Sequence, residues 1–240
     1  MNFIDIHKTN GFSLAEVLIT LGAISIVAVM TIPSLMIHIN TTKFRTQYKK
    51  TLSNLNQAAL NAETNFDLNF AAVTSPCVRA TDDPRSVSSV CGILNGTLTG
   101  ATYYSQAEIS SMGVKGVYSP QGTGITSRPK AYYMFADGSL LGFDTQLQGC
   151  TLMPGENITT LKEQCYGFID VNGTTAPNKA VECSIPTSTK ITNDQSNCTV
   201  RNNSVDMGDV FPVALHDSTV EPLTNAARYV LNQSIMNTKD

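Results

Sequence analysis

GFSLAEVLITLGAISIVAVMTIPSLMI, residues 11–37, is the stretch of this 240-residue chain that decides its fold. From Val17 to Ile37 it contains no ionisable side chain. An α-helix rises about 1.5 Å per residue, so this uncharged run reaches roughly 31 Å, about the thickness of the hydrocarbon core of a membrane. The sequence therefore predicts a membrane-spanning helix over residues 12–37.

A secretory signal peptide is the first ordinary alternative. Such a peptide has a short apolar stretch followed by a cleavage site of the A-x-A type. Here the apolar stretch is too long, and residues 38–42 (HINTT) contain no such site. A plain membrane anchor fits the length but does not explain Gly11, Phe12 and Glu16.

Glu16 is the one carboxylate at the start of the apolar run. A charged group in lipid is costly and requires a partner or a role. It also completes the pattern S-x-x-E with Ser13, a capping box in which each side chain satisfies an amide at the helix start. These residues alone do not decide whether Glu16 only caps the helix or also has a functional role.

Residues 8–21, KTNGFSLAEVLITL, resemble the processing signal of type IV prepilins and type II secretion pseudopilins. The resemblance implies a leader over residues 1–11, cut after Gly11 by a prepilin peptidase that methylates the new amine of Phe12. It also implies that Glu16 and Pro33 correspond to the glutamate and the helix-interrupting proline of that family. The strict resemblance covers only about the first 40 to 60 residues.

The chemistry of such a cut can be stated from the residues. Cleavage creates a cationic amine at Phe12, one helical turn before Glu16, and positions i and i+4 share a helix face. A carboxylate in lipid recovers much of its desolvation cost beside a fixed cation, in its own chain or in a neighbour. Cleavage is therefore expected to act as a switch for assembly, and methylation keeps the charge.

Pro33 stands inside the predicted helix. Proline removes one backbone hydrogen bond and crowds the preceding turn, so a kink is expected near residues 32–34. Membrane helices also tolerate proline without a special role. Two interpretations of Pro33 are retained. Either it loosens the helix locally so that subunits can pack, or the helix tolerates it without a special role.

The orientation of the span is indicated by two opposing signals. Charge bias alone would place the C-terminal side in the cytoplasm, because basic residues follow the span. The cysteines and the family resemblance favour the opposite orientation, with the head in the periplasm or outside the cell and a single pass through the bacterial inner membrane. The basic residues are Lys43, Arg45, Lys49 and Lys50.

Beyond the span, apolar residues recur at intervals of three and four, which indicates an amphipathic helix over residues 38–66. The simplest interpretation is one continuous helix over residues 12–66. Its apolar stripe would pack on a globular head formed by residues 67–240. The expected fold is α+β and pilin-like, a long helix on a small antiparallel sheet with disulfide-stapled loops. The stripe consists of Phe44, Tyr48, Leu52, Leu55, Ala59, Ala62 and Phe66.

Short apolar runs in the head predict its strands. Residues 130–135 and 140–143 flank a D-G turn, which is typical of a hairpin. Further strands are expected over 166–171 and 210–215. A capping-box pattern predicts a short helix from Ser105 to about Met112, and a C-terminal helix is expected near 221–235, with Leu223, Ala227, Val230 and Leu231 facing inward.

The six cysteines all follow the span, which favours an oxidising compartment and disulfides. Many pairings are compatible with six cysteines, and sequence alone cannot choose among them. The sequential set is favoured, in which each bridge closes a small loop worth about 3 kcal/mol. Zinc is the rival interpretation, weakened by the lack of C-x-x-C. The cysteines are Cys77, Cys91, Cys150, Cys165, Cys183 and Cys198.

A calcium site is a further prediction. Residues 170–173 (DVNG), 177–179 (PNK) and 208–211 (GDVF) resemble a D-x-N-G…PN…G-D-x-F pattern of bacterial pilin-like proteins, here interrupted by an insert with two cysteines. Oxygen ligands before a glycine turn could hold calcium at Asp170, Asn172 and Asp209. The alternative is an N-G turn that closes a hairpin.

No catalytic motif is present, and we expect the chain not to be an enzyme. His216 beside Asp217 could be taken as a catalytic pair, but adjacent strand residues point to opposite faces, so a satisfied or surface histidine is expected. A net charge of −3 provides no basic field, so the head is not expected to bind nucleic acid.

The resemblance implies a structural subunit, a pilin or pseudopilin, of a type IV pilus-like or type II secretion filament. Its partners would be further copies and other pilin-like subunits, the prepilin peptidase and an assembly platform in the inner membrane. The alternative of another class is a membrane-anchored extracytoplasmic enzyme or binding domain with an inert anchor.

Overall fold

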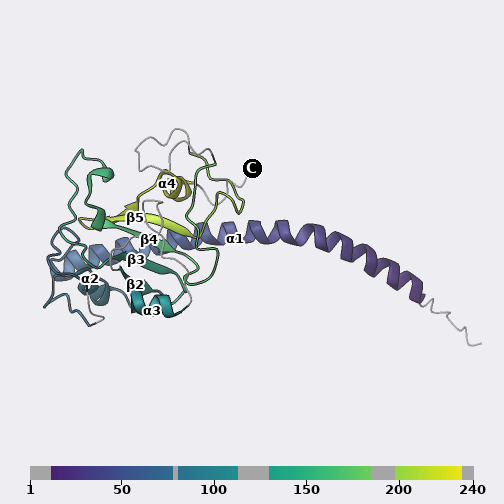
Figure 1. Cartoon of the computed structure of the whole chain (residues 1–240), viewed down its shortest axis with the longest axis horizontal. Coiled ribbons are helices and arrows are strands. Elements are labelled where there is room, and N and C mark those ends of the chain that lie inside the picture. Colours follow the sequence, from purple (N-terminus) through teal and green to yellow (C-terminus); the bar gives the residue numbers. More distant parts are fainter. Residues whose placement is uncertain (1–11, 78–80, 113–129, 185–197, 234–240) are drawn as a thin grey trace, which may run out of the picture.

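The structure is a computed structural model that describes residues 12–77, 81–112, 130–184 and 198–233, without the side chains of residues 33, 34, 37 and 38. Figure 1 shows a head from which one long helix, α1, projects. α1 spans Leu14–Phe66, and it begins at the N-cap Ser13 and ends at Asp67 in the left-handed conformation. The predicted helix over 12–66 is therefore confirmed to within two residues.

The inner half of α1 packs on the head through the predicted stripe. Its members are buried or partly buried in the main core, so the amphipathic pattern is confirmed. Tyr48 is fully buried and stacks on Phe211, with ring centroids 4.1 Å apart. Asn56 makes two side-chain hydrogen bonds to the backbone of Val220, each 2.8 Å long. These contacts fix α1 against two strands of the sheet.

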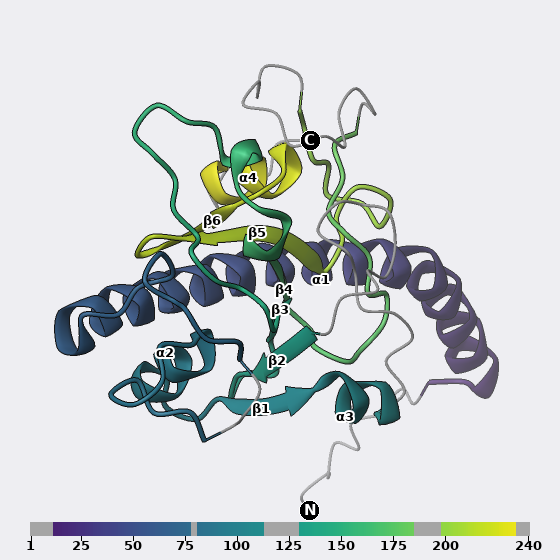
Figure 2. The same cartoon turned by 60° about the vertical axis from the view of Figure 1, so that its left-hand side comes forward.

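Six strands form one antiparallel sheet in chain order, β1-β2-β3-β4-β5-β6. Figure 2 shows the strands side by side, with α1 running past them. The D-G hairpin is confirmed as β2 and β3, paired from Lys130↔Asp144 to Met134↔Leu140. The strands are β1 Thr102–Ser105, β2 Lys130–Met134, β3 Leu140–Asp144, β4 Tyr166–Asp170, β5 Val210–His216 and β6 Thr219–Pro222.

The two faces of the sheet bury different clusters. On β2, Tyr133 belongs to the main core shared with α1, while Tyr132 belongs to a smaller cluster that includes Ile109 of α3. This division follows from the period of two along a strand. Gly142 lies opposite Phe168, whose ring occupies the space that a side chain at position 142 would need.

The remaining elements surround the sheet. α3 begins at a capping box of Ser105 and Glu108, as predicted. α4 begins later than expected, because residues 221 and 222 extend β6 and Thr224 caps the helix; residues 234 and 235 lie outside the described residues. The structure also contains β1, β6 and α2, which the sequence did not predict. The elements are α2 Val90–Thr97, α3 Gln106–Ser111, α4 Asn225–Asn232, and the 3-10 helices η1 Ile158–Thr160 and η2 Glu163–Cys165.

The cysteines form the sequential pairs Cys77–Cys91, Cys150–Cys165 and Cys183–Cys198. The favoured disulfide pairing is confirmed, and no thiolate is left for the zinc alternative. The fold class is α+β, with an apolar N-terminal helix, a six-stranded antiparallel sheet and three disulfides.

Candidate functional site

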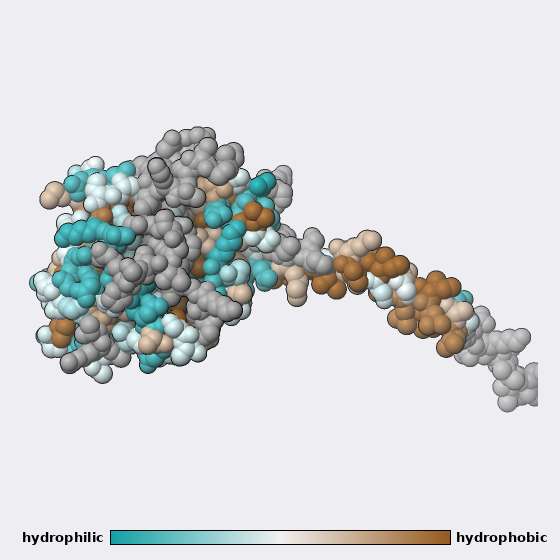
Figure 3. Space-filling model, viewed as in Figure 1, coloured by the Kyte–Doolittle hydropathy of each residue, from teal (hydrophilic) through white to brown (hydrophobic). Residues whose placement is uncertain are grey.

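The projecting half of α1 is bare. Leu14–Ile32 has a mean hydropathy of 2.2, and none of it is buried against the rest of the chain. Figure 3 shows this part as a hydrophobic rod that projects from a largely hydrophilic head. By length and composition the segment can cross a membrane, as predicted.

The start of α1 holds a formed capping box. Glu16 Oε2 accepts from the backbone amide of Ser13 at 2.8 Å, and Ser13 Oγ accepts from the amide of Glu16 at 3.3 Å. The capping interpretation of Glu16 is therefore realised in the uncut chain. Phe12 is 87% exposed, and Gly11 and the rest of the leader, residues 1–11, lie outside the described residues.

Pro33 does not break α1. The backbone is helical through residues 31–40, and Figure 1 shows the projecting part as a curved rather than an interrupted helix. The hydroxyl of Thr31 donates to the carbonyl of Val27 at 3.0 Å just before the proline. The kink expected near residues 32–34 stays a prediction, since Figure 1 shows a smooth curve of the projecting half.

Three of the four basic residues after the span, Arg45, Lys49 and Lys50, are engaged by the head. Lys50 pairs with Asp137 at 3.0 Å, in the turn between β2 and β3. Lys49 donates to the carbonyl of Gln233, and burial, then the nearby Arg45, lowers the pKa of its ammonium. These contacts explain why basic residues stand here even though charge bias alone suggests the opposite membrane orientation.

Asp170 and Asp209 are both buried and lie at neighbouring strand ends, where Asp170 pairs with Val210. Asp209 accepts from the backbone amides of Asn178 at 2.9 Å and Lys179 at 2.6 Å. Burial raises the pKa of Asp209, against the effect of these amides. Burial, then the charge of Asp209, raises the pKa of Asp170 to about 8. The structure thus brings the separated halves of the motif together.

Asn172 and Asn178 complete this cluster. The backbone amide of Asn172 donates to Asp170 Oδ1 at 3.1 Å. The turn here does not close a hairpin, because β4 pairs with β5, which begins only at Val210. With its amide nitrogen turned inward, Asn178 donates to Asp170 Oδ2 at 3.0 Å and to the carbonyl of Gly173 at 3.3 Å. Asn178 was not among the predicted site residues, although the sequence pattern that predicted the calcium site includes the pair Pro177-Asn178.

The cluster fits calcium only in part. Its carboxylates and amide oxygens are the right ligand types. Both oxygens of Asp209, however, already accept from backbone amides, an arrangement that suits a structural carboxylate. Among the described residues, no group of three or more His, Cys, Asp or Glu side chains could hold a metal ion. Calcium at Asp170, Asn172 and Asp209 stays a prediction.

His216 lies between two carboxylates. Its Nδ1 is 2.9 Å from Asp217 Oδ2, and its Nε2 is 3.0 Å from Glu221 Oε1. The expectation that His216 and Asp217 point to opposite faces is wrong, because Asp217 lies in the β5–β6 turn with a φ of 46° rather than on the strand. Both ring nitrogens are occupied, so this histidine has no free nitrogen to act as a base.

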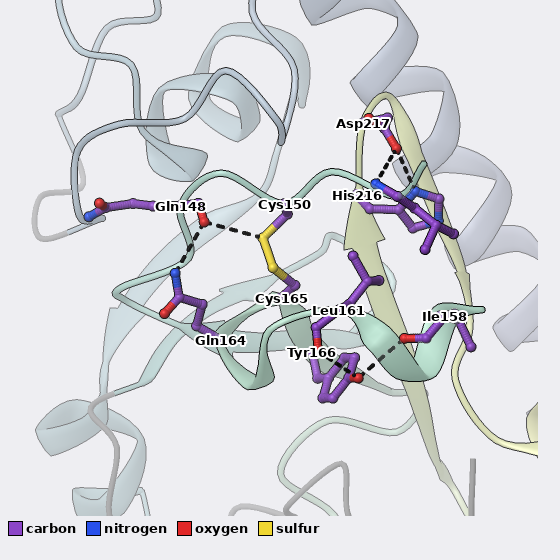
Figure 4. Close-up of a disulfide and its surroundings, with 10 residues drawn as sticks. Gln148, Cys150, Ile158, Leu161, Gln164, Cys165, Tyr166, His216 and Asp217 are labelled. Atoms are coloured by element: carbon purple, nitrogen blue, oxygen red, sulfur yellow. Dashed lines mark hydrogen bonds and ion pairs between the residues drawn. A yellow bond between two sulfur atoms is a disulfide. The ribbon is translucent and has the colours of Figure 1, made fainter. Parts of the chain in front are cut away.

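Figure 4 shows this hairpin beside the Cys150–Cys165 disulfide. Asp217 Oδ2 also accepts from the amide of Leu152 at 3.1 Å, and the amide of Asp217 donates to the carbonyl of Cys150 at 2.8 Å. The histidine cluster and the disulfide therefore hold the same loop against the sheet. This arrangement is a structural clamp.

The clamp predicts a pH dependence of stability. Burial opposes protonation of His216, but its hydrogen bonds to Glu221 and Asp217 prevail and raise its pKa above the ordinary value of 6.5. A raised folded-state pKa gives stability that is complete below the unfolded-state value and is lost as pH rises through the folded-state value. The hydrogen bond to His216 lowers the pKa of the Glu221 carboxyl below its ordinary value of 4.5, so the stability that it contributes is lost as pH falls below that value.

We therefore expect the free energy of unfolding to fall by roughly 1–2 kcal/mol above pH 6.5, as the charged hydrogen bonds of His216 are lost. Urea titrations at a series of pH values, followed by circular dichroism, measure this decrease. The variant His216→Gln should have a flatter profile over the same range. Identical profiles for the two proteins would contradict the assignment.

Comparisons of the chain with protein-family models, with curated proteins and with solved structures give no match.

Proposed function

We propose that the chain is a structural subunit of a membrane-rooted helical filament, of the type IV pilin or type II secretion pseudopilin class. One observation carries the proposal. A single helix begins as a bare apolar rod long enough to cross a membrane and continues without interruption into the core of a disulfide-linked head. Such a rod requires an apolar environment, which lipid provides before assembly and neighbouring helices provide afterwards.

Glu16 distinguishes this apolar helix from a plain membrane anchor. Its carboxylate sits among exposed apolar side chains, and within the described part of the chain its hydrogen-bond partner is the helix cap at Ser13. Cleavage after Gly11 would add a cationic amine at Phe12. That amine offers the Glu16 of an adjacent, staggered subunit a charge partner in an environment of low dielectric constant, where pairing is strong.

The proposed location follows from the same features. The span crosses the bacterial inner membrane once, with the head in the periplasm or outside the cell, where disulfides form. The partners are further copies and related subunits, the prepilin peptidase and an inner-membrane assembly platform. In this role the chain is not itself an enzyme, and the filament serves secretion or a surface appendage.

Mass spectrometry of the mature N-terminus tests the proposal directly. We expect the chain purified from membranes of its native host to begin with an N-methylated Phe12. The matched variant Gly11→Val should remain uncut, because the peptidase recognises the small residue before the cut. An unmodified chain that begins at Met1 in functional material would contradict the filament role.

The alternative is an extracytoplasmic domain on an inert anchor. The capping box favours it, because the bonds with Ser13 give Glu16 a role at the start of α1 that needs no second subunit. On this alternative the anchor could be replaced by an unrelated apolar helix without loss of activity, whereas a filament subunit would lose assembly.

A further inference from the structure

A cleft of about 300 Å³ lies beside the part of α1 that packs on the head. One wall is α1 from Lys50 to Asn61, and the other consists of residues 97–99 at the end of α2 and residues 135–137 in the β2–β3 turn. Figure 2 shows α2 beside this part of α1. The volume is at the lower end of what small-molecule sites occupy, roughly 300–1,000 Å³.

Three side-chain amides follow one another along the α1 wall. Asn54, Gln57 and Asn61 stand at intervals of three and four residues, so they share one face of the helix and span about 10 Å along its axis. All three are exposed, and none makes a side-chain hydrogen bond within the described part of the chain. Each amide can both donate and accept, so the row suits a ligand that carries donors and acceptors side by side.

A small apolar floor lies among these amides. Ala58 is four residues after Asn54 and three before Asn61, and it lines the cleft although it is buried. Leu98 and Phe135, both partly buried, line the opposite wall. The cleft therefore has room for a methyl group or the apolar face of a sugar ring, with amides close by.

The charges that line the cleft cancel. Lys50 and Asp137 pair with each other at 3.0 Å, and the hydroxyl of Ser139 also donates to Asp137 at 2.6 Å. The rest of the lining is uncharged, and Thr97 and Thr99 add hydroxyl groups to it. A charged ligand would compete with this ion pair, so an uncharged polar ligand fits the cleft better than an anion or a cation does.

An N-acetylated amino sugar carries the matching groups. Its acetamido substituent combines an N–H donor, a carbonyl acceptor and a methyl group, and its ring hydroxyls both donate and accept. A side-chain amide can form two hydrogen bonds with such a substituent. A peptide also carries amides, but extended peptides pair with the backbone of a sheet edge, whereas the polar groups of this cleft belong mainly to side chains.

We propose that this cleft binds an uncharged oligosaccharide of N-acetylated amino sugars. Gln57 and Asn61 bond the acetamido group, whose methyl lies against Ala58, and Thr99 bonds a ring hydroxyl. The proposal goes beyond the filament role. It requires only that the head lies outside the cytoplasm, where such glycans are present.

Isothermal titration calorimetry of the full chain tests the proposal, in a phosphocholine detergent that has no sugar headgroup. The two probes are chitotriose and cellotriose, which differ in having an acetamido or a hydroxyl group on each ring. We expect chitotriose to bind about tenfold more tightly, the effect of one or two hydrogen bonds. Gln57→Ala should weaken chitotriose binding about tenfold. Asn65→Ala removes an exposed amide of the same helix outside the cleft and should bind like the wild type.

Equal affinity for the two sugars, or no binding of either, would overturn the site. Chitotriose binding that Gln57→Ala leaves unchanged would also overturn it, because the sugar would then occupy another surface. Self-association of the chain that Gln57→Ala abolishes would overturn it in favour of a second copy as the occupant. The filament role is tested separately by the mass of the mature N-terminus, so failure of this site leaves that role intact.

Discussion

The variant Glu16→Ala is expected to insert into the membrane normally and to enter filaments roughly a hundredfold to a thousandfold less efficiently, because an unpaired charge at a buried site costs about 3–5 kcal/mol. In this variant the unpaired charge is the amine of Phe12 in the adjacent subunit. Fractionation of membranes and quantification of sheared filaments measure the two effects separately.

Two matched variants separate charge pairing from helix capping. Glu16→Gln keeps the capping interaction, since glutamine serves at this position of a capping box, but it removes the charge. Ser13→Ala removes the cap and keeps the charge. Pairing across subunits predicts that Glu16→Gln fails to assemble and that Ser13→Ala assembles. The reverse pattern would leave Glu16 with its capping role alone.

Gly208→Ala is expected to have the largest effect on the stability of the head, about 3 kcal/mol, at the upper end of what overpacking costs. A Cβ at this position would collide with the backbone carbonyl of Lys179 and lie 2.6 Å from that of Ala180. Movement of this carbonyl is opposed because it accepts a hydrogen bond from the amide of Val210 at 3.0 Å. Gly208 therefore keeps the two halves of the aspartate motif in contact.

The control for this prediction is Gly155→Ala. Gly155 has a φ of 89° but nothing within 4 Å of the added Cβ, so this change tests backbone strain without crowding. Its expected cost is about 1–2 kcal/mol. Urea denaturation of both variants in detergent, followed by circular dichroism, gives the comparison. Equal costs would show that crowding at Gly208 is relieved by movement of the backbone.

Local patterns in the sequence predicted the elements that carry a strong period or a specific turn. The stripe from Phe44 to Phe66, the D-G hairpin and the capping boxes at Ser13 and Ser105 are all present in the structure. The edge strands β1 and β6 were missed because each is only four residues long and partly exposed. Such short strands are stabilised by pairing rather than by their own composition.

The candidate sites were only partly predictable. The disulfide pairing was favoured by the even spacing of the cysteines, and it is confirmed. The predicted geometry of His216 and Asp217 was wrong. Asp217 is a turn residue with a positive φ, so the alternation of side chains along β5 does not continue to it. The pairing of Lys50 with Asp137 was not foreseen, since the partner of a side chain on an exposed helix face depends on which distant segment packs opposite it.

By itself the sequence determined the long apolar helix, its amphipathic continuation and the hairpin, because each depends on neighbours within a few residues. Only the tertiary structure decided that Asp170 lies beside Asp209 and that Lys50 meets Asp137. These contacts join segments far apart in the chain, so they depend on how the sheet and α1 pack rather than on any local period. The described residues thus combine a locally encoded rod with a head whose sites form only on folding.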